Sequence, residues 1–306
     1  MLQRLRYRVR EALGLVRMQE TINVLQQRSD MLDAPGHFAA LHAAVDELQA
    51  LRAVMGGTLL AEHSMPATQP VISIVMATRD RSALLRRAIE SVLRQSYPHW
   101  QLVVVDDGST DATPSVLDAF PDPRIVRLRT DGVRAAAARN RGLEVATGDW
   151  VAFLDDDNVM ATHWLRGVAA FADMHSDAVV AYGAQWRQFE PTDADPSGSY
   201  LWFRPVFDAV ALREANHVDL GALVVRRDSP ELRFDESLRR FIDWELVVRL
   251  AAVHEVHPLP VLSGVYFTQV DRRITHDGGL DAWREFAARL ADPADPVGTP
   301  FSLRQG

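Results

Sequence analysis

The sequence predicts an α/β fold, in which a mostly parallel, doubly wound sheet is flanked by helices and preceded by an N-terminal helical arm. Two observations predict it. From residue 71 onward, apolar segments of strand length alternate with amphipathic helical segments, which is the pattern of βαβ units. Clusters of polar residues follow three of the apolar segments, at the strand ends where such sheets bind ligands.

Residues 1–65 have apolar side chains at helical spacing, interrupted at Pro35-Gly36 and ending at Gly56-Gly57. This pattern predicts a helical arm or hairpin. Three roles stay open for it: a helix pair packed on the following domain, a coiled-coil contact that forms a homo-oligomer, or a peripheral contact with a membrane surface. Residues 66–70 contain two prolines and are expected to be a linker.

The alternating region is expected to form one domain with two halves, residues 71–157 and 158–275, followed by a tail at 276–306 that is Pro-rich beyond residue 290. The expected strands are residues 71–78, 102–106, 124–128, 150–154, 178–182 and 218–225. The expected helices are residues 82–95, 111–120, 134–146, 162–172 and 241–253.

Composition narrows the class of protein. The formal net charge is −8, so no overall basic field points to a nucleic-acid partner. The chain has no cysteine, which excludes disulfides, thiolate metal sites and a cysteine nucleophile and fits a reducing compartment. No apolar run approaches the roughly 20 residues that span a bilayer. We therefore expect a cytoplasmic protein, with the inner face of the membrane as a possible peripheral location.

Asp155, Asp156 and Asp157 directly follow an apolar strand. Hard divalent cations such as Mg²⁺ and Mn²⁺ prefer carboxylate oxygens, and crowded carboxylates are unfavourable without a cation. One aspartate here would also suit the N-cap of the next helix. Three are more than a cap requires, so the triplet favours a metal site.

A second acidic segment, Asp106-Asp107-Gly108-Ser109-Thr110-Asp111, follows another apolar strand. It is either a tight turn that caps a helix or part of a binding site. Two acidic strand ends in one parallel sheet favour a shared crevice.

These segments and several others, taken in order, resemble glycosyltransferase family 2, a group of enzymes with the Rossmann-like GT-A fold. The resemblance covers residues 71 to 250 and rests on these stretches: VISIVMATRDR (71–81), SYPHW (96–100), VDDGSTD (105–111), ARNRG (138–142), ATGD (146–149), FLDDD (153–157), FDESL (234–238) and DWEL (243–246).

The resemblance implies an inverting transfer of a sugar from a nucleotide-diphosphate donor, UDP by default, to a hydroxyl of a glycan, lipid-linked or small-molecule acceptor. It implies Mn²⁺ or Mg²⁺ on Asp155 and Asp157, and a general base at Asp243. The donor-binding residues that it implies are Ala77, Thr78, Arg79, Asp107, Arg139 and Asp156. Acceptor-side or loop contacts are expected at Trp244, Glu245 and His276.

Two departures from the family pattern leave alternatives open. Arg79-Asp80 stands where the family has a Tyr-Asn-like pair, and Ile242 stands where an acidic residue often precedes the base. Asp243 and Glu245 therefore compete for the role of base, or both lie on a solvated helix face. A retaining GT-A enzyme, a nucleotidyltransferase and a non-catalytic sugar-nucleotide-binding protein are the rival functions.

Overall fold

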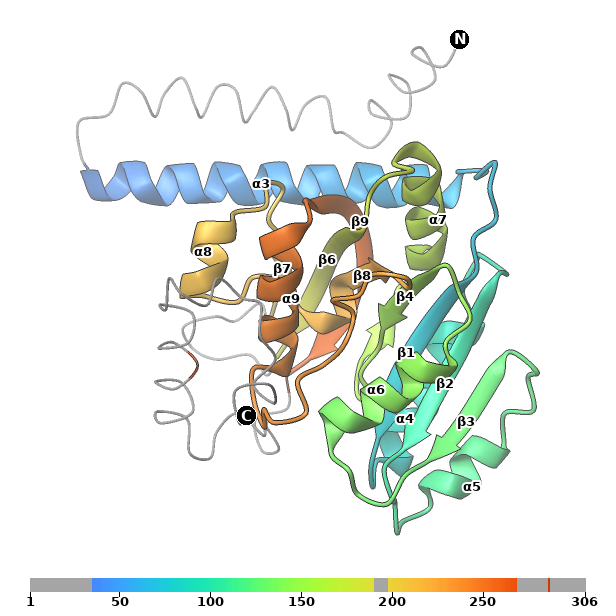
Figure 1. The fold of residues 1–306 in the computed structure, drawn as a ribbon. Helices are drawn as coiled ribbons and strands as arrows, with labels where there is room; N and C mark the ends of the chain where they lie inside the picture. Colours follow the sequence, from blue (N-terminus) through green and yellow to red (C-terminus); the bar gives the residue numbers. More distant parts are fainter. Residues whose placement is uncertain (1–34, 190–197, 269–285, 287–306) are drawn as a thin grey trace.

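The computed structural model describes residues 35–189, 198–268 and 286. Within them nine strands form a single sheet (Figure 1). The strands are β1 (Ile72–Thr78), β2 (Trp100–Asp106), β3 (Ile125–Arg129), β4 (Trp150–Phe153), β5 (Val159–Met160), β6 (Val180–Gln188), β7 (Ser199–Trp202), β8 (Leu223–Arg226) and β9 (Val256–Phe267). The helices are α3 (Pro35–Glu62), α4 (Ser82–Leu93), α5 (Thr113–Asp118), α6 (Ala135–Val145), α7 (Trp164–Met174), α8 (Ala209–Glu214), the 3-10 helix η1 (Leu220–Ala222) and α9 (Ile242–Val253).

The strand order is β3-β2-β1-β4-β8-β6-β9-β5, with β7 beside β6. Strands β1 to β4 are parallel, whereas β8 runs antiparallel to both β4 and β6. The register places Thr78 opposite Asp106 and Val75 opposite Phe153. The polar segments that follow β1, β2 and β4 therefore emerge together at one edge of the sheet.

Side-chain alternation along β1 divides the core between the two faces of the sheet. Ile72, Ile74 and Met76 pack with buried side chains of α4 and α7, while Val75 packs with those of α6 and α9. Helices thus cover both faces, which confirms the α/β class. The close approach of α6 requires Gly142, because a Cβ there would lie 2.6 Å from Cγ1 of Val75.

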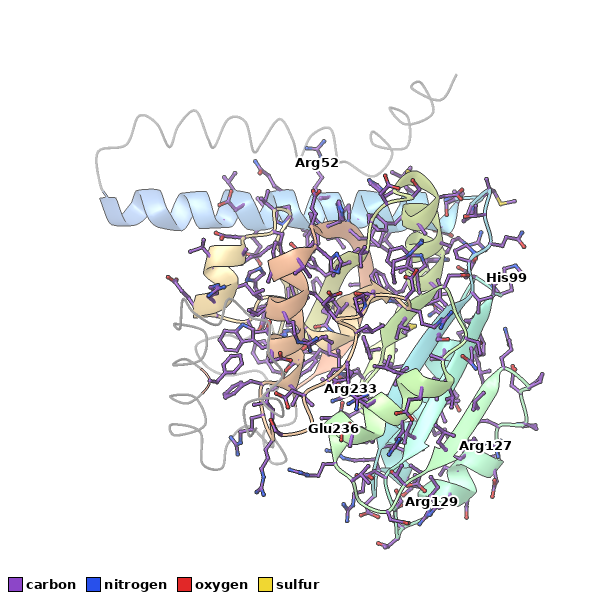
Figure 2. The ribbon with its side chains drawn as sticks, viewed as in Figure 1. Arg52, His99, Arg127, Arg129, Arg233 and Glu236 are labelled. Atoms are coloured by element: carbon purple, nitrogen blue, oxygen red, sulfur yellow. The ribbon has the colours of Figure 1, made fainter. Side chains whose placement is uncertain are left out.

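Helix α3 lies across one end of the domain (Figure 1), and its outer side carries Arg52, which points away from the sheet (Figure 2). It begins at Pro35, a residue suited to the first turn of a helix. The expected stop at Gly56-Gly57 is wrong, because the helix continues to Glu62. Gly57 is a packing contact: a Cβ there would lie 1.8 Å from the carbonyl oxygen of Pro260 in β9.

The packing of α3 bears on the three roles left open for the arm. Val45, Ala50, Val54 and Ala61 are buried, and the backbone N–H of Leu262 donates to Oγ1 of Thr58 over 2.9 Å. From residue 45 onward, α3 is therefore a helix packed on the domain. Residues 1–34 lie outside the described residues, so a pairing of two helices is untested. In the described part of the chain, no helix combines the length and apolar character needed to cross a bilayer.

The strands and helices expected between β1 and α7 are confirmed to within two residues at each end, and β5 is an addition among them. Larger differences follow α7. The strand expected at residues 178–182 is β6, which begins at Val180 and continues to Gln188. The expected strand at residues 218–225 is shorter, because η1 precedes β8. Strands β5, β7 and β9 and helix α8 were not expected. Strand β9 is continuous but contains Pro258 and Pro260, which weaken its strand pattern in the sequence. Residues 190–197, and the expected tail at 276–306 except Phe286, lie outside the described residues.

Candidate active site

A cleft of about 520 Å³ lies at the edge of the sheet where β1, β2 and β4 end. Its lining contains every residue expected to bind the donor or a metal: Ala77, Thr78, Arg79, Asp107, Arg139, Asp155, Asp156 and Asp157. Sequence reasoning missed other lining residues: Arg81, Arg134, Ala135, Ala136, Leu238, Arg239, Ile242 and Tyr266. The expectation that the acidic strand ends share one crevice is confirmed.

The aspartate triplet follows β4 and differs in surroundings from one residue to the next. Asp155 Oδ1 accepts a hydrogen bond from Arg139 Nη2 over 2.8 Å, and Asp157 Oδ2 lies 3.6 Å from Arg81 Nη1. Asp156 is 8% exposed, and burial raises its pKa to about 7. Burial, and after it the charge of Asp155, raises the pKa of Asp157. Burial and the neighbouring carboxylates therefore disfavour full ionisation of the triplet when no cation is bound.

Buried carboxylates whose ionisation is disfavoured fit a bound divalent cation, which would stabilise their charged forms. Mg²⁺ and Mn²⁺ are commonly held by one or two carboxylates, with substrate phosphates and water completing the coordination. Asp155 and Asp157 supply such a pair. No group of three or more possible protein ligands is found among the described residues, so an ion here would depend on ligands from a substrate or water.

Asp107 is already hydrogen-bonded within the protein. Its Oδ1 accepts from Thr130 Oγ1 and from the backbone N–H of Val133, each over 2.7 Å, and its Oδ2 accepts from the backbone N–H of Arg134 over 2.8 Å. Burial alone would raise the pKa of Asp107. The three hydrogen bonds outweigh burial, so the pKa of Asp107 lies below its usual value. Asp107 thus shapes the loop that enters α6, and its expected contact with a nucleobase stays a prediction.

Arg134 takes a backbone conformation that is unusual for any residue but glycine. Its φ and ψ are 79° and 162°, directly before the first turn of α6. The two N–H bonds to Asp107 hold this conformation. It places Arg134, Ala135 and Ala136 in the cleft wall, so the first turn of α6, whose backbone N–H groups favour anions, borders the cleft.

Five arginines and four aspartates line the cleft. Arg139 pairs with Asp155, and Arg81 pairs with Asp157. Arg134 and Arg239 have no side-chain hydrogen bond or ion pair within the described part of the chain. Guanidinium groups beside a carboxylate pair suit a ligand that carries phosphate and brings a cation with it.

Asn140 connects α6 to the segment before α9. Its Nδ2 donates to the carbonyl of Phe234 over 2.9 Å and to Glu236 Oε1 over 2.8 Å, and its Oδ1 accepts from the N–H of Phe234. Glu236 also pairs with Arg233 over 3.1 Å, and the two lie side by side in Figure 2. The ARNRG and FDESL segments are thereby held together beside the cleft.

The two candidate bases on α9 differ in their partners. Glu245 is 7% exposed and forms two hydrogen bonds with Arg249, of 2.8 and 3.0 Å. Asp243 has no arginine partner among the described residues; Asn216 Nδ2 lies 3.4 Å from its Oδ2. Burial raises the pKa of Asp243, the charge of Arg139 lowers it, and that of Asp155 raises it. Asp243 does not line the cleft, but its neighbour Ile242 does.

Two expected acceptor-side contacts need comment. Trp244 is 5% exposed within the core cluster on the α6 and α9 face, and its indole N–H donates to the carbonyl of Leu212. The expectation that it contacts an acceptor is therefore not supported, because its ring is part of the core. His276 lies outside the described residues.

Comparison with known proteins gives a consistent result. Residues 73–228, more than half of the chain, match the family model described as "Glycosyl transferase family 2". Succinoglycan biosynthesis protein ExoO of Rhizobium meliloti is 32% identical over 197 residues, which are 60% of this chain and 56% of that protein. The putative colanic acid biosynthesis glycosyl transferase WcaA of Escherichia coli is 41% identical over 191 residues, 59% of this chain and 66% of that protein. The chain thus spans less than two thirds of each relative.

Solved structures are similar at lower identity. The S. aureus TarS structure with UDP has a TM-score of 0.49 and 17% identity, and covers 72% of this chain and 63% of that chain. The Pyrobaculum calidifontis mannosyltransferase PcManGT with GDP-Man and Mn²⁺ has a TM-score of 0.48 and 20% identity, and covers 80% of this chain and 72% of that chain.

Proposed function

Because the chain belongs to glycosyl transferase family 2, we propose that it transfers a sugar, with inversion, from a nucleoside-diphosphate donor to a hydroxyl acceptor, using a divalent cation. One observation carries the proposal: the aspartate triplet and five arginines line the same cleft, at the edge where β1, β2 and β4 end. Such a site suits a diphosphate with its metal ion.

On the donor side, Asp155 and Asp157 would hold Mn²⁺ or Mg²⁺. When bound, the ion would stabilise the negative charge that develops on the departing nucleoside diphosphate. Arg134 and Arg239 face the same cleft and contribute positive charge for the phosphates. Ala77, Thr78, Arg79 and Asp107 form the end of the cleft that we assign to the nucleoside, with UDP as the default from the family resemblance.

On the acceptor side, Asp243 is the proposed base. It accepts the proton of the acceptor hydroxyl while that oxygen attacks the anomeric carbon opposite the diphosphate. The new bond to oxygen forms as the bond to the phosphate oxygen breaks, so the anomeric configuration inverts. Glu245 is unsuited to this step because both its oxygens are engaged by Arg249.

The names of two relatives, which print succinoglycan and colanic acid biosynthesis, support a role in polysaccharide biosynthesis. We propose a glycan or lipid-linked acceptor, with a small-molecule acceptor as the alternative. A cytoplasmic location, and contact of residues 1–65 with a membrane or with a second copy, stay predictions.

A nucleotide-sugar screen tests the proposed function. UDP-, GDP- and dTDP-sugars are added with and without Mn²⁺ while the melting temperature is measured, since a ligand of the folded state raises it. CMP-sugars, which have a single phosphate, are the control. We expect stabilisation by at least one diphosphate donor, only with metal, and a product of inverted configuration by NMR. Equal stabilisation by CMP-sugars, or none at all, contradicts the proposal, and a retained configuration contradicts the inverting mechanism.

A further inference from the structure

One face of β6 carries polar side chains among aromatic rings. Gln185 and Arg187 are two residues apart and so share that face. Arg187 lies opposite Tyr266 of β9, and Gln185 lies opposite Trp202 of β7. The guanidinium carbon of Arg187 is 4.1 Å from the ring centroid of Trp202 and 4.9 Å from that of Tyr266. Because Tyr266 also lines the cleft, this face adjoins the candidate active site.

Asp219, directly before η1, reaches this face. Its Oδ2 pairs with Arg187 Nη2 over 3.3 Å, and its Oδ1 accepts from Gln185 Nε2 over 2.8 Å and from the N–H of Gly221 over 2.9 Å. The side chains of Arg187 and Asp219 are 21% and 13% exposed, so the cluster is recessed but open at its outer edge.

Two hydrogen-bonding positions in the cluster are unfilled. Gln185 is 3% exposed, yet its Oε1 has no partner within the described part of the chain, and the same holds for Nε of Arg187. Buried polar atoms without partners are rare and costly. One is an acceptor and the other a donor, which matches the capacity of a hydroxyl group to donate and accept. Both atoms are covered in this structure, so a hydroxyl group reaches them only when the side chains of the cluster shift.

The charges of the proposed metal pair and of the proposed base act on Asp219. Burial raises the pKa of Asp219 to about 6; the charge of Arg187 lowers it, and those of Asp155 and Asp243 raise it. Asp155 belongs to the proposed metal pair and Asp243 is the proposed base. Tyr266 lines the cleft and contacts Arg187, so a ligand in contact with the cluster would lie beside the proposed donor site.

We propose that Asp219, Arg187 and Gln185 form a hydroxyl-binding subsite for a pyranose ring of the acceptor, with Trp202 and Tyr266 as its aromatic walls. The inference rests on the proposed function, because it takes the acceptor to be a sugar. It adds a specificity determinant to the residues that the family resemblance implies.

The test measures binding of simple sugars to the whole chain loaded with Mn²⁺ and a nucleoside diphosphate. Methyl glucoside, galactoside and mannoside are titrated by saturation-transfer NMR. Asp219→Asn keeps the shape of the side chain but removes its charge. Gly221→Ala keeps both charges of the Asp219–Arg187 pair but places a methyl carbon 2.9 Å from Gln185 Nε2 and 3.4 Å from Asp219 Oδ1. Asp228→Asn is the matched control, since Asp228 is 77% exposed and its partner Arg226 is 3.9 Å away.

We expect at least one methyl glycoside to bind the wild type, with a Kd about tenfold higher or more in both subsite variants, as for loss of a charged or buried hydrogen bond. The Kd of the nucleoside diphosphate should stay within about twofold of wild type, and the control should change neither constant. A lower melting temperature with unchanged sugar affinity contradicts the subsite and assigns the cluster a structural role, with water at the unfilled positions.

Two other outcomes also contradict it: no binding of any methyl glycoside to the wild type, or an equal loss of nucleotide affinity, which would place Asp219 in the donor site. Absence of metal-dependent nucleotide binding to the wild type would instead contradict the proposed function. The same titrations on the unloaded protein then still decide whether the subsite binds sugar.

Discussion

Arg139 of α6 and Asp155, just beyond β4, form an ion pair, with 2.8 Å between Nη2 and Oδ1. The pair joins the helix that carries the ARNRG segment to the aspartate triplet. Its two charges act in opposite directions on Asp243, since Arg139 lowers the pKa of that carboxyl group and Asp155 raises it. The donor side of the cleft thereby influences the proposed base.

Replacing Arg139 should expose this coupling. In Arg139→Gln the positive charge that lowers the pKa of Asp243 is gone, so the pKa of the base rises. A base must be deprotonated to act, and activity is lost as pH falls through its pKa. We expect the acidic limb of the kcat profile to move to higher pH. A limb at the wild-type position would show that Arg139 does not influence the base.

The assignment of the base is tested by two isosteric substitutions on α9. Asp243→Asn should reduce transfer by roughly 10²–10⁴, the usual contribution of general-base catalysis, and leave donor affinity within a few-fold of wild type. Glu245→Gln should leave kcat nearly unchanged and lower the melting temperature, because Arg249 loses a charged partner. Turnover and donor Kd are measured for both. Greater loss of turnover in Glu245→Gln would mean that the base has been assigned to the wrong carboxylate.

Asp156 predicts a pH-dependent stability. Its pKa is about 7 in the folded protein, against 3.8 for an unperturbed aspartate. Ionisation of the Asp156 carboxyl group is therefore less favourable in the folded than in the unfolded protein. The free energy of unfolding of the wild type should fall for this reason as pH rises from about 4 to 7. Asp156→Asn stays neutral, so its melting temperature relative to wild type should rise across that window and level off above it. The measurement uses thermal unfolding in EDTA; parallel curves for the two proteins would refute the prediction.

The contact between α3 and β9 predicts opposite effects at two adjacent glycines. A Cβ added at Gly56 would meet no neighbouring atom within 4 Å, and alanine favours a helix over glycine by up to about 1 kcal/mol, so Gly56→Ala should stabilise. Gly57→Ala should destabilise, because its Cβ would overlap the Pro260 carbonyl. Urea unfolding measures both. Stabilisation by both substitutions would mean that α3 does not pack on β9 in solution. A protein that lacks residues 1–65 but is still soluble and active would contradict the packing of α3 in the same way.

The sequence predicted the elements around the cleft because local signals agree there: alternating apolar segments, aspartates at strand ends and glycines at turns. It failed where tertiary contacts override local signals. Gly57 lies inside a helix because β9 requires a close approach, and β9 contains two prolines yet pairs with β6. Tyr266 was missed as a cleft residue because its strand was not expected. The sequence does not distinguish a buried Trp244 from an exposed one, because it does not show which face of α9 is buried.

The proposed metal site is tested most directly by calorimetry of a nucleoside diphosphate binding to the whole chain, with and without Mn²⁺, in wild type and Asp157→Asn. Asp157 is proposed to hold the ion, and burial raises its pKa, so its charge is disfavoured until a cation is present. We expect Mn²⁺ to increase the affinity for the nucleoside diphosphate in wild type, and we expect Asp157→Asn to remove most of this increase. Equal Mn²⁺-dependent affinity in the two proteins would contradict it.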